Sequence, residues 1–584
     1  MGHKQFGITT DIYEAGLSSI GAIRLNVLLA KATDKPVSIQ DLKSHPTVRD
    51  LETFFAGQMA AETYETQADY PLTQTQNGIL VECISHPGST FYNIPALFKL
   101  SEKIDTERLK AAIEKTIEAH PYLNMTIFTD DQGNFRARRN DDAALQVEVA
   151  ETDKLPEKLI VPFELLGGKL SRFRIYRTAE GCYLFMELHH IIGDGSSVSI
   201  LLNDINEAYM GRPVTKESYT GFELGLDEEK LRKTKKYDDA KAYFDGLLAE
   251  ADREMLPEGD VYGESASSGT LVEPANIDLA EVKRFLRASG QSANAFFNAA
   301  FAFVLSRFTG KKEALYTTIY NGRSDSRVSR SVTMMVKTFP VFLHLKSGDS
   351  VLEFVDSVNT QLMNGMANDI YSFAEIAQTH GISSDVMFVY QGNEFIFDSI
   401  GGEKAEMALI EGSEAKAPLH VEIFEKDGWA VFNCEYSKAR FSDDYMHRLL
   451  ACLEETVREF TRKKRLSDIC IADEKALSEM DSFNETNAPY PNTDIVSLFR
   501  AAADRFPERP AVIFKEEELT YRQVDEISDR IAAYLRSKGI GKGTVVSILI
   551  PRCSYMATAS LGVLKTGAAY QPLDPSYPSE RLSF

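Results

Sequence analysis

Two adjacent histidines, His189 and His190, precede Asp194 and Gly195 in the stretch HHIIGDG. An imidazole exchanges a proton near neutral pH, and a nearby carboxylate can orient it or can pair with an arginine. Glycine permits a backbone conformation or a close approach that a side chain would block. These residue types at this spacing indicate acid–base chemistry in a loop between two secondary-structure elements.

The element before this loop is predicted to be one strand, CYLFMELHH, and the element after it a helix, SVSILLNDINEAY. Side chains alternate along a strand, so only one of the two histidines should face a given cleft. The alternatives are a buried histidine bonded to a backbone carbonyl and a metal site. Diverging histidines without a further ligand cluster speak against a metal site, and the lack of a GxSxG motif in the sequence speaks against a seryl hydrolase.

The composition narrows the class of protein. The chain has 584 residues, of which 43% are hydrophobic and 26% charged, enough for several packed cores. A formal net charge of −22 would repel nucleic acid and anionic membranes, so neither is an expected partner. No apolar run reaches membrane-spanning length and no secretory signal is present in the sequence, so we expect a cytoplasmic protein. Six scattered cysteines should be reduced core residues.

The chain divides into regions of different pattern. Short helices are followed by a linker, then by a long stretch in which strands and helices alternate, and then by a further α/β start. In the long stretch, DTERLKAAIEKTIEAHP places Leu109, Ala112, Ile113 and Ile117 on one helical face, and YLNMTIF has the pattern of a strand. The expected ranges are 1–57 for the helical unit, 58–69 for the linker, 70–472 for the α/β domain with subdomains of about 70–235 and 250–472, and 473–584 for the last unit.

A second candidate site lies near the start of the chain, where Ser18 and Ser19 precede an amphipathic pattern in DIYEAGLSSIGAIRL. A serine at a helix start caps the helix by accepting backbone N–H bonds. The positive end of the helix dipole also suits a serine that carries a phosphate ester. The local pattern by itself favours capping.

HHIIGDG resembles the HHxxxDG motif of the condensation domains of nonribosomal peptide synthetases, which have a chloramphenicol-acetyltransferase-like fold. Five further stretches resemble that family's motifs in the same order, namely YPLTQTQNGIL, EAHPYLNMTIF, YNGRSDSRVSRSVTMMVKTFPV, NDIYSF and SSDVMFVYQG. The resemblance covers roughly residues 70 to 470. Ser196 stands where tryptophan is common and Lys337 where asparagine is common, which bears on donor and acceptor preference.

The flanking stretches resemble domains of the same synthetases. DIYEAGLSSI is similar to the attachment site of peptidyl carrier domains, which implies 4′-phosphopantetheine on Ser19. LTYRQVDE and VLKTGAAYQPLDPSYPSERL resemble the first two motifs of ANL-type adenylation domains. The remaining adenylation motifs would lie beyond Phe584, so ATP and magnesium belong to a complete adenylation domain and no adenylation activity is expected here. The resemblance therefore implies a fragment with a truncated carrier, a condensation domain and a truncated adenylation start.

The resemblance also implies a reaction. The α-amine of an acceptor aminoacyl thioester would attack a donor acyl or peptidyl thioester and form an amide. An α-amino group titrates at about 7.7 to 8.0, so much of it is already neutral in the cell and no strong base is required. His190 holds the family's catalytic position and would accept a proton from the amine or orient it.

The other residues of HHIIGDG receive supporting roles. The resemblance implies that Asp194 holds the loop through an arginine, with Arg323 as the suggested partner and Arg172 as the second candidate. Gly195 would present its backbone N–H to the developing oxyanion, and His189 would support the turn.

Three other functions stay open at this point. A CoA-dependent acyltransferase of the same fold would use an equivalent histidine, an epimerase of the same superfamily shares HHxxxDG, and a noncatalytic scaffold would only recruit enzymes. The flanking motifs favour condensation. The implied partners are upstream and downstream synthetase modules with their carrier domains, aminoacyl and peptidyl thioesters, and a phosphopantetheinyl transferase.

Overall fold

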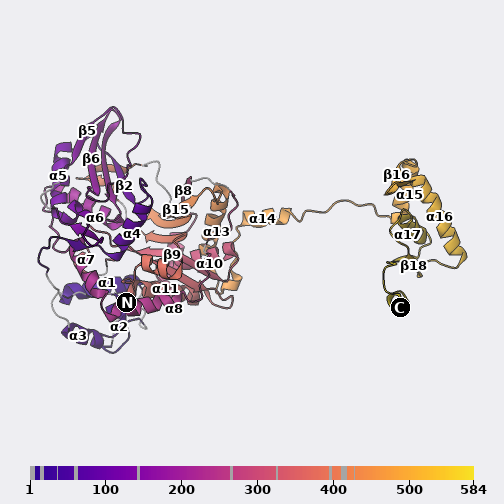
Figure 1. Cartoon of the computed structure of the whole chain (residues 1–584), viewed down its shortest axis with the longest axis horizontal. Helices are drawn as coiled ribbons and strands as arrows, with labels where there is room; N and C mark the ends of the chain where they lie inside the picture. Colours follow the sequence, from indigo (N-terminus) through magenta and orange to yellow (C-terminus); the bar gives the residue numbers. More distant parts are fainter. Residues whose placement is uncertain are drawn as a thin grey trace. The chain divides into compact units, whose positions relative to one another are not determined.

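The chain forms two compact units in the computed structural model, Met1–Ser478 and Glu479–Phe584 (Figure 1). The first unit contains the HHIIGDG stretch. The structure describes residues 7–13, 17, 19–33, 35, 37, 39–57, 64–140, 145–254, 256–262, 267–323, 326–392, 397–408, 417–426 and 428–583.

Three short helices begin the first unit, namely α1 (Ser19–Thr33), α2 (Ile39–Ser44) and α3 (Val48–Gly57). They lie where the sequence predicts helices. Leu42 and Leu51 are buried in one apolar cluster with side chains of the second half of this unit, and α2 contacts α11 (Val351–Ala367). These helices are therefore packed against the α/β part of the unit.

The first half of the α/β part is built on a six-stranded sheet with the order β12-β13-β2-β7-β6-β5. Every pairing in it is antiparallel except that of β5 with β6. The strands are β2 (Asn93–Leu100), β5 (Glu148–Glu151), β6 (Ser171–Thr178), β7 (Gly181–His189), β12 (Ser399–Ile400) and β13 (Glu403–Met407). The range of about 250–472, expected for the second subdomain, also contributes to this sheet. Its strand β13 pairs with the edge of β2, where backbone partners are available, and β12 pairs with β13.

Three helices accompany this sheet, namely α4 (Gln74–Ser85), α5 (Thr106–Ala119) and α6 (Gly195–Tyr209). The Asp105 side chain caps α5 by accepting the N–H groups of Glu107 and Arg108. All four residues predicted on the inner face of α5 are buried, so that prediction is confirmed.

One strand prediction is wrong in part. The first three residues of YLNMTIF belong to a 3-10 helix, η1 (Pro121–Asn124), and the strand β3 (Thr126–Thr129) starts only after Met125. Pro121 causes the difference, because its fixed φ and missing N–H suit the first position of a helical turn. β3 belongs to a small sheet whose other strands are β1 (Tyr70–Pro71) and β4 (Phe135–Arg138).

The second half has its own six-stranded sheet, with the order β10-β9-β11-β14-β15-β8. Its strands are β8 (Ser268–Pro274), β9 (Glu313–Tyr320), β10 (Lys337–His344), β11 (Val386–Gly392), β14 (Leu419–Lys426) and β15 (Trp429–Ser437). The helices of this half, besides α11, are α9 (Leu279–Ser289), α10 (Ala293–Thr309), α12 (Phe373–His380) and α13 (Asp443–Arg462), and η3 (Leu466–Asp468) follows them.

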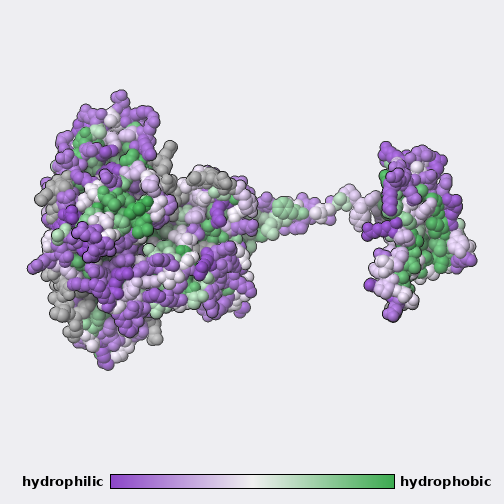
Figure 2. Space-filling view, viewed as in Figure 1, coloured by the Kyte–Doolittle hydropathy of each residue, from purple (hydrophilic) through white to green (hydrophobic). Residues whose placement is uncertain are grey.

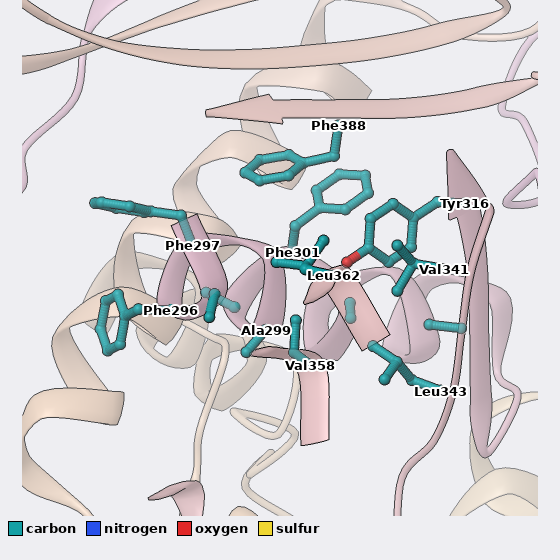
Figure 3. Close-up of a cluster of buried hydrophobic side chains, with 14 of the residues drawn as sticks. Phe296, Phe297, Ala299, Phe301, Tyr316, Val341, Leu343, Val358, Leu362 and Phe388 are labelled. Carbon is teal, nitrogen blue, oxygen red and sulfur yellow. The ribbon is translucent and has the colours of Figure 1, made fainter. Parts of the chain in front are cut away.

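The core of this half lies around α10, which is apolar on every side and therefore buried. Phe301 stacks on Phe388 of β11 with ring centroids 4.6 Å apart (Figure 3). Tyr316 of β9 and Val341 of β10 close the cluster.

Two further helices, α7 (Gly221–Leu231) and α8 (Lys235–Leu247), lie along the chain between β7 of the first sheet and β8 of the second. A later connection joins β9 to β10 and includes η2 (Ser326–Val328). Residues 330–336 of this connection are here called the crossing segment. They reach into the first half before the chain returns to the second half at β10. Val332 and Met334 of this segment are buried in the core of the first half. The two halves are thus tied together by exchanged chain segments.

The second unit contains the helix–strand alternation that the sequence predicts. Hydrophobic residues gather on its surface, whereas hydrophilic residues cover most of the visible surface of the first unit (Figure 2). Exposed apolar side chains in the second unit include Ile495, Ile513, Val545 and Leu549. Its elements, after α14 (Glu474–Ser482), are α15 (Ile495–Arg505), β16 (Pro510–Phe514), β17 (Glu517–Thr520), α16 (Tyr521–Ser537), β18 (Val545–Leu549), α17 (Tyr555–Leu564), β19 (Ala569–Leu573) and α18 (Ser579–Ser583).

The cysteines only partly match the prediction of core residues. All six are free thiols, but Cys434 alone is buried and Cys470 is exposed. Apolar neighbours in sequence do not determine whether a side chain faces the core, because that depends on the packing of other elements.

Candidate active site

The HHIIGDG stretch forms a tight connection from β7 to α6. β7 ends at His189, so His190 is the first turn residue, contrary to the prediction of one strand through both histidines. The His189 N–H donates to the Leu170 carbonyl at 2.8 Å, and the His190 N–H donates to the Tyr92 carbonyl at 2.7 Å. The two backbone N–H groups therefore bond to separate chain segments, which fixes the direction of the turn.

His189 is buried and sits in an apolar surrounding. Its Nδ1 accepts the Ile191 N–H at 3.2 Å, its Nε2 lies 3.7 Å from Cys83 Sγ, and its ring meets Phe163 edge-on. Burial, with the neighbouring His190 as a smaller cause, lowers the pKa of His189 to about 3. His189 is therefore neutral at physiological pH, and its contacts suit support of the turn.

His190 is half-buried and faces the crossing segment. Its Nδ1 lies 3.2 Å from Met334 Sδ, and its ring stands edge-on to the Tyr92 ring with centroids 6.2 Å apart. A thioether sulfur is a weak acceptor, and this contact suits orientation of the ring.

Asp194 is fully buried and caps α6. Its Oδ1 accepts the Ser197 N–H at 2.8 Å and Arg323 Nη2 at 3.0 Å, and its Oδ2 accepts Arg323 Nη1 at 2.8 Å. The N–H groups of Met335 and Val336 donate to Oδ2 at 2.9 and 3.2 Å. The carboxylate thus joins the start of α6 to the crossing segment.

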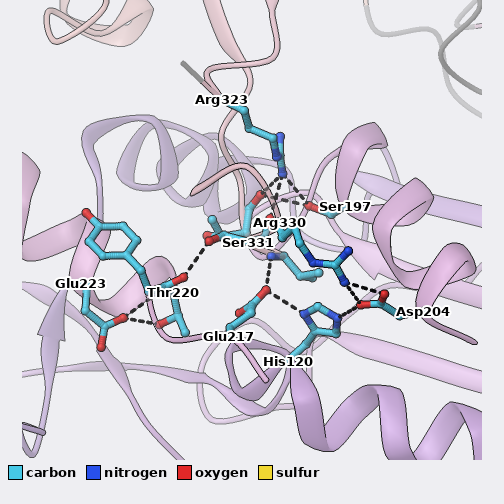
Figure 4. Close-up of polar contacts among 12 residues, drawn as sticks. His120, Ser197, Asp204, Glu217, Thr220, Glu223, Arg323, Arg330 and Ser331 are labelled. Atoms are coloured by element: carbon cyan, nitrogen blue, oxygen red, sulfur yellow. Dashed lines mark hydrogen bonds and ion pairs between the residues drawn. The ribbon is translucent and has the colours of Figure 1, made fainter. Parts of the chain in front are cut away.

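The charge of Asp194 is stabilised by these contacts. Burial by itself would raise its pKa, but the Arg323 guanidinium and the backbone N–H groups outweigh burial and hold the pKa below its usual range. Arg323 also donates to the carbonyls of Ser331 and Thr333 at 3.1 and 3.3 Å (Figure 4). Two planar donors on one carboxylate fix its orientation as well as its charge.

Arg172, the second candidate partner of Asp194, lies elsewhere. Its Nη1 donates to Glu187 at 2.6 Å, and its guanidinium carbon stands 3.8 Å from the centroid of the Phe163 ring. The choice between the two arginines is therefore settled by the ion pair of Asp194 with Arg323.

Gly195 is the first residue of α6. The N–H groups of a first helical turn have no partner within the helix, and the helix dipole makes that end positive. Gly195 therefore places a backbone donor in the loop that follows His190, a position suited to developing negative charge.

The start of α1 coincides with Ser19. The side chain of Ser19 and all of Ser18 lie outside the described residues. A helix start suits a phosphodiester, because first-turn N–H groups and the helix dipole favour phosphate oxygens. Ser19 therefore fits a residue that holds a 4′-phosphopantetheine arm.

The sequence interpretation missed a second buried polar cluster. His120 lies between Asp204 and Glu217, and Arg330 of the crossing segment also binds Asp204 (Figure 4). His120 is part of the quoted stretch EAHPYLNMTIF, where a histidine directly before a proline at a helix end is the only local signal. Its three partners lie far away in sequence, so their convergence is a result of the tertiary fold.

Family comparisons agree with this architecture. The condensation-domain model matches residues 66–476, which is more than half of the chain. The model of the phosphopantetheine attachment site matches residues 2–55, and that of AMP-binding enzymes matches residues 499–584. The three matches follow the order expected from the resemblance, so a nonribosomal peptide synthetase fragment is confirmed, with only part of an AMP-binding region.

Curated relatives match over the whole chain. Bacitracin synthase 2 of Bacillus licheniformis is 25% identical, with 100% of this chain and 23% of its own length covered. Gramicidin S synthase 2 of Brevibacillus brevis is 24% identical, with 100% of this chain and 14% of its own length covered. The chain therefore spans less than a quarter of the length of these relatives.

Solved structures share the fold. A holo four-domain nonribosomal peptide synthetase bound to AMP and glycine has a TM-score of 0.72 at 16% identity, with 90% of this chain and 43% of that chain covered. The first condensation domain of the CDA synthetase has a TM-score of 0.56 at 16% identity, with 70% of this chain and 100% of that chain covered. The predicted condensation-domain fold is thereby confirmed.

The described residues offer neither a cluster that could hold a metal ion nor a helix that could span a membrane. They contain no group of three or more His, Cys, Asp or Glu side chains arranged to hold a metal ion. None of the helices in the described ranges combines the length and apolar character needed to cross a membrane.

Proposed function

The chain belongs to the condensation-domain family, and on this premise we propose that it joins a donor acyl or peptidyl thioester to the α-amine of an acceptor aminoacyl thioester. An amide C–N bond forms, the donor C–S bond breaks, and the donor thiol leaves with a proton. The position of His190 carries the proposal. Its side chain is half-buried directly after the end of β7. The loop around it is held by the buried ion pair of Asp194 with Arg323.

His190 is assigned to the acceptor amine. An α-amine has a pKa of about 7.7 to 8.0, so a large fraction is neutral at cellular pH and the imidazole need not be a strong base. The amine nitrogen gains positive charge as it attacks, and His190 then accepts its proton or orients it by a hydrogen bond. Met334 and Tyr92 fix the plane of the ring for this role.

Gly195 and Asp194 support the same step in different ways. As the tetrahedral intermediate forms, its oxygen becomes negative, and the Gly195 N–H is a donor at the positive end of α6. Asp194 does not exchange a proton in this proposal, because Arg323 holds the pKa of its carboxyl below the usual range. Its hydrogen bonds hold the loop in a fixed position relative to the start of α6.

The helices α1 to α3 would act as the donor carrier, within the proposed carrier range 1–57. The arm on Ser19 would supply the thiol that carries the acyl group. Asp41 of α2 pairs with Lys236 of α8 at 2.6 Å, and Lys43 of α2 donates to Asn364 of α11. The carrier helices therefore rest on the same unit that contains His190. The remaining proposed ranges are 58–69 for the linker, 70–472 for condensation and 473–584 for the adenylation start.

The partners follow from this assignment. A phosphopantetheinyl transferase would load Ser19, and modules upstream and downstream would deliver and receive thioesters. We propose a cytoplasmic location, supported by the free cysteines, which are typical of a reducing compartment.

The first test asks whether Ser19 accepts the arm. Intact-protein mass is measured after incubation with coenzyme A and a phosphopantetheinyl transferase, for the wild type, Ser18→Ala and Ser19→Ala. A gain of one arm that is lost only in Ser19→Ala is the expected result. A gain retained by Ser19→Ala overturns the assignment of the site.

The second test measures amide formation in a single turnover with the loaded chain and a soluble aminoacyl thioester mimic. His190→Ala should lower the rate constant by about 10² to 10⁴, the range for loss of a general base. The matched control is His86→Ala, which removes an exposed histidine at the end of α4. Equal rates for the wild type and His190→Ala would refute the role of His190, and no amide from the wild type would refute the function.

A further inference from the structure

The His120 cluster holds a charged histidine in the interior. Its Nδ1 lies 2.7 Å from Glu217 Oε1 and its Nε2 lies 2.8 Å from Asp204 Oδ2, and the ring is fully buried. An ionised carboxylate only accepts hydrogen bonds, so both ring nitrogens donate when Asp204 and Glu217 are ionised. Burial by itself would lower the pKa of His120, but the carboxylates of Asp204 and Glu217 raise it above its usual value. Two acidic oxygens on the two ring nitrogens therefore favour the imidazolium form of His120.

The cluster brings two acidic and two basic side chains together. Burial raises the pKa of Glu217, whereas at Asp204 the bonds to His120 and Arg330 outweigh burial and lower the pKa. Both oxygens of Asp204 accept from Arg330 Nη2, at 2.6 and 2.9 Å, so an imidazolium and a guanidinium face two carboxylates. Loss of the His120 proton would leave one buried negative charge without compensation, which is costly in a low-dielectric interior. Protonation of His120 therefore determines how strongly the four residues of the cluster bind one another.

The cluster binds the first part of the crossing segment. Arg330 reaches Asp204, and the Val332 N–H donates to Glu217 Oε1 at 2.5 Å. Between them, the Ser331 hydroxyl donates to a backbone carbonyl of the first half at 2.7 Å. The last part of the same segment is held by Asp194, which accepts two of its N–H groups.

The crossing segment has two attachments, and each uses an acid from α6 or its cap. Asp194 at the start of α6 binds the last part of the segment, and Asp204 belongs to the cluster that binds its first part. Asp194 and Asp204 are separated by about 15 Å along the helix axis at the usual rise per residue. An extended segment of the length of 330–336 spans about 20 Å, so it can run beside α6 between the two acids. Met334 lies between the attachment points, and its sulfur contacts Nδ1 of His190.

We propose that His120 is a positioning residue for the condensation reaction: it fixes the crossing segment from one end, and through Met334 it sets the orientation of the His190 ring. This inference rests on the proposed function and concerns the same site. His120 itself does not touch the reacting atoms. A role in stability alone would leave the His190 ring, and the pH dependence of the chemical step, unchanged by loss of His120.

The spectroscopic test uses the full chain labelled with ¹⁵N-histidine. In the wild type at neutral pH, the His120 resonances should show a proton on both ring nitrogens. His120→Gln and Arg330→Met should each shift the tautomer populations of His190, whereas His447→Gln should not. His447 is the matched control, since it pairs with Glu273 at 3.3 Å on the surface of α13.

The kinetic test measures single-turnover amide formation by the loaded chain from below the ordinary histidine pKa of about 6.5 into the alkaline range. The wild type should lose rate on the alkaline side as His120 loses its proton. His120→Gln should lack that alkaline loss and should be slower by about 10- to 100-fold at neutral pH, as expected for a misplaced catalytic group. Arg330→Met should show a smaller loss.

The outcomes separate the alternatives. A neutral His120 ring, or His190 resonances unchanged in both variants, would overturn the inference. If His120→Gln does not fold, Arg330→Met decides, because its side chain is 59% exposed and its removal leaves His120 paired. If the wild type forms no amide, the proposed function fails, while the His190 resonances still decide whether His120 positions the ring.

Discussion

Two attachments hold the crossing segment to α6, and they differ in the cation they use. At the start of the helix, Asp194 pairs with Arg323, whose guanidinium stays charged at every physiological pH. Two to three turns further on, Asp204 binds His120 as well as Arg330. The comparison shows that one segment can be fixed by a permanent charge at one end and by a titratable charge at the other.

Asp194 and His120 should respond to pH in opposite directions. The pKa of Asp194 is lower in the folded chain, so its stabilisation is present above the ordinary carboxyl pKa of about 3.9 and is lost as pH falls through the folded value. The pKa of His120 is raised, so its stabilisation is fully present below about 6.5 and is lost as pH rises through the folded value.

The largest effect is expected for Arg323→Met. This change leaves the buried carboxylate of Asp194 without its cation, which costs about 3 to 5 kcal/mol in the free energy of unfolding. Urea denaturation followed by circular dichroism measures it. Arg212→Met is the control, because Arg212 pairs with Glu207 near the surface of the same helix. Equal losses for the two variants would contradict the assignment.

Arg323→Lys tests whether Asp194 needs the paired hydrogen bonds of Arg323 as well as its charge. Lysine keeps the charge but cannot place two planar donors on Asp194, so a loss of about 1.5 to 3 kcal/mol is expected, below that of Arg323→Met. The same urea titration tests it. A stability equal to the wild type would show that charge alone, without the paired hydrogen bonds, fixes the carboxylate.

A pH-dependent effect of about 1 to 2 kcal/mol is expected at His120, the net worth of two hydrogen bonds. Wild-type stability should decline as pH rises above about 6.5, and His120→Gln should remove that decline. The difference between the two proteins should therefore be greatest below about pH 6.5. A constant difference across this window would show that His120 is not charged in the folded chain.

The smallest effect is expected for Arg330→Met. Because this arginine is largely exposed, its loss should cost about 0.2 to 1 kcal/mol in global stability. Locally, amide hydrogen exchange of residues 330–336 should become faster, while exchange of β7 should not change. Unchanged exchange in the crossing segment would show that Arg330 is not one of its anchors.

Local patterns were enough for much of the fold. The inner face of α5 follows from its helical period, and its cap follows from Asp105. The expected strand through both histidines was one residue too long, because where a strand ends depends on how far its neighbours continue. The 3-10 turn at Pro121 was missed because propensity for a strand competes there with the geometry of proline.

The candidate site likewise combines residues that a local motif predicts with contacts that only the fold determines. The positions of His189, His190, Asp194 and Gly195 follow from a short motif. Whether Asp194 would pair with Arg323 or with Arg172 did not follow, because both arginines are distant in sequence or separated by a strand and only packing brings one of them close.

The sequence by itself determined the family, the order of its regions, and the acid–base residues of one loop, because these depend on residue types at short, fixed spacings. Only the tertiary structure decided that a buried histidine, two carboxylates and an arginine from separate segments form one cluster. The reason is physical: hydrogen bonds and ion pairs act over a few ångströms, and folding alone determines which distant residues come within that range.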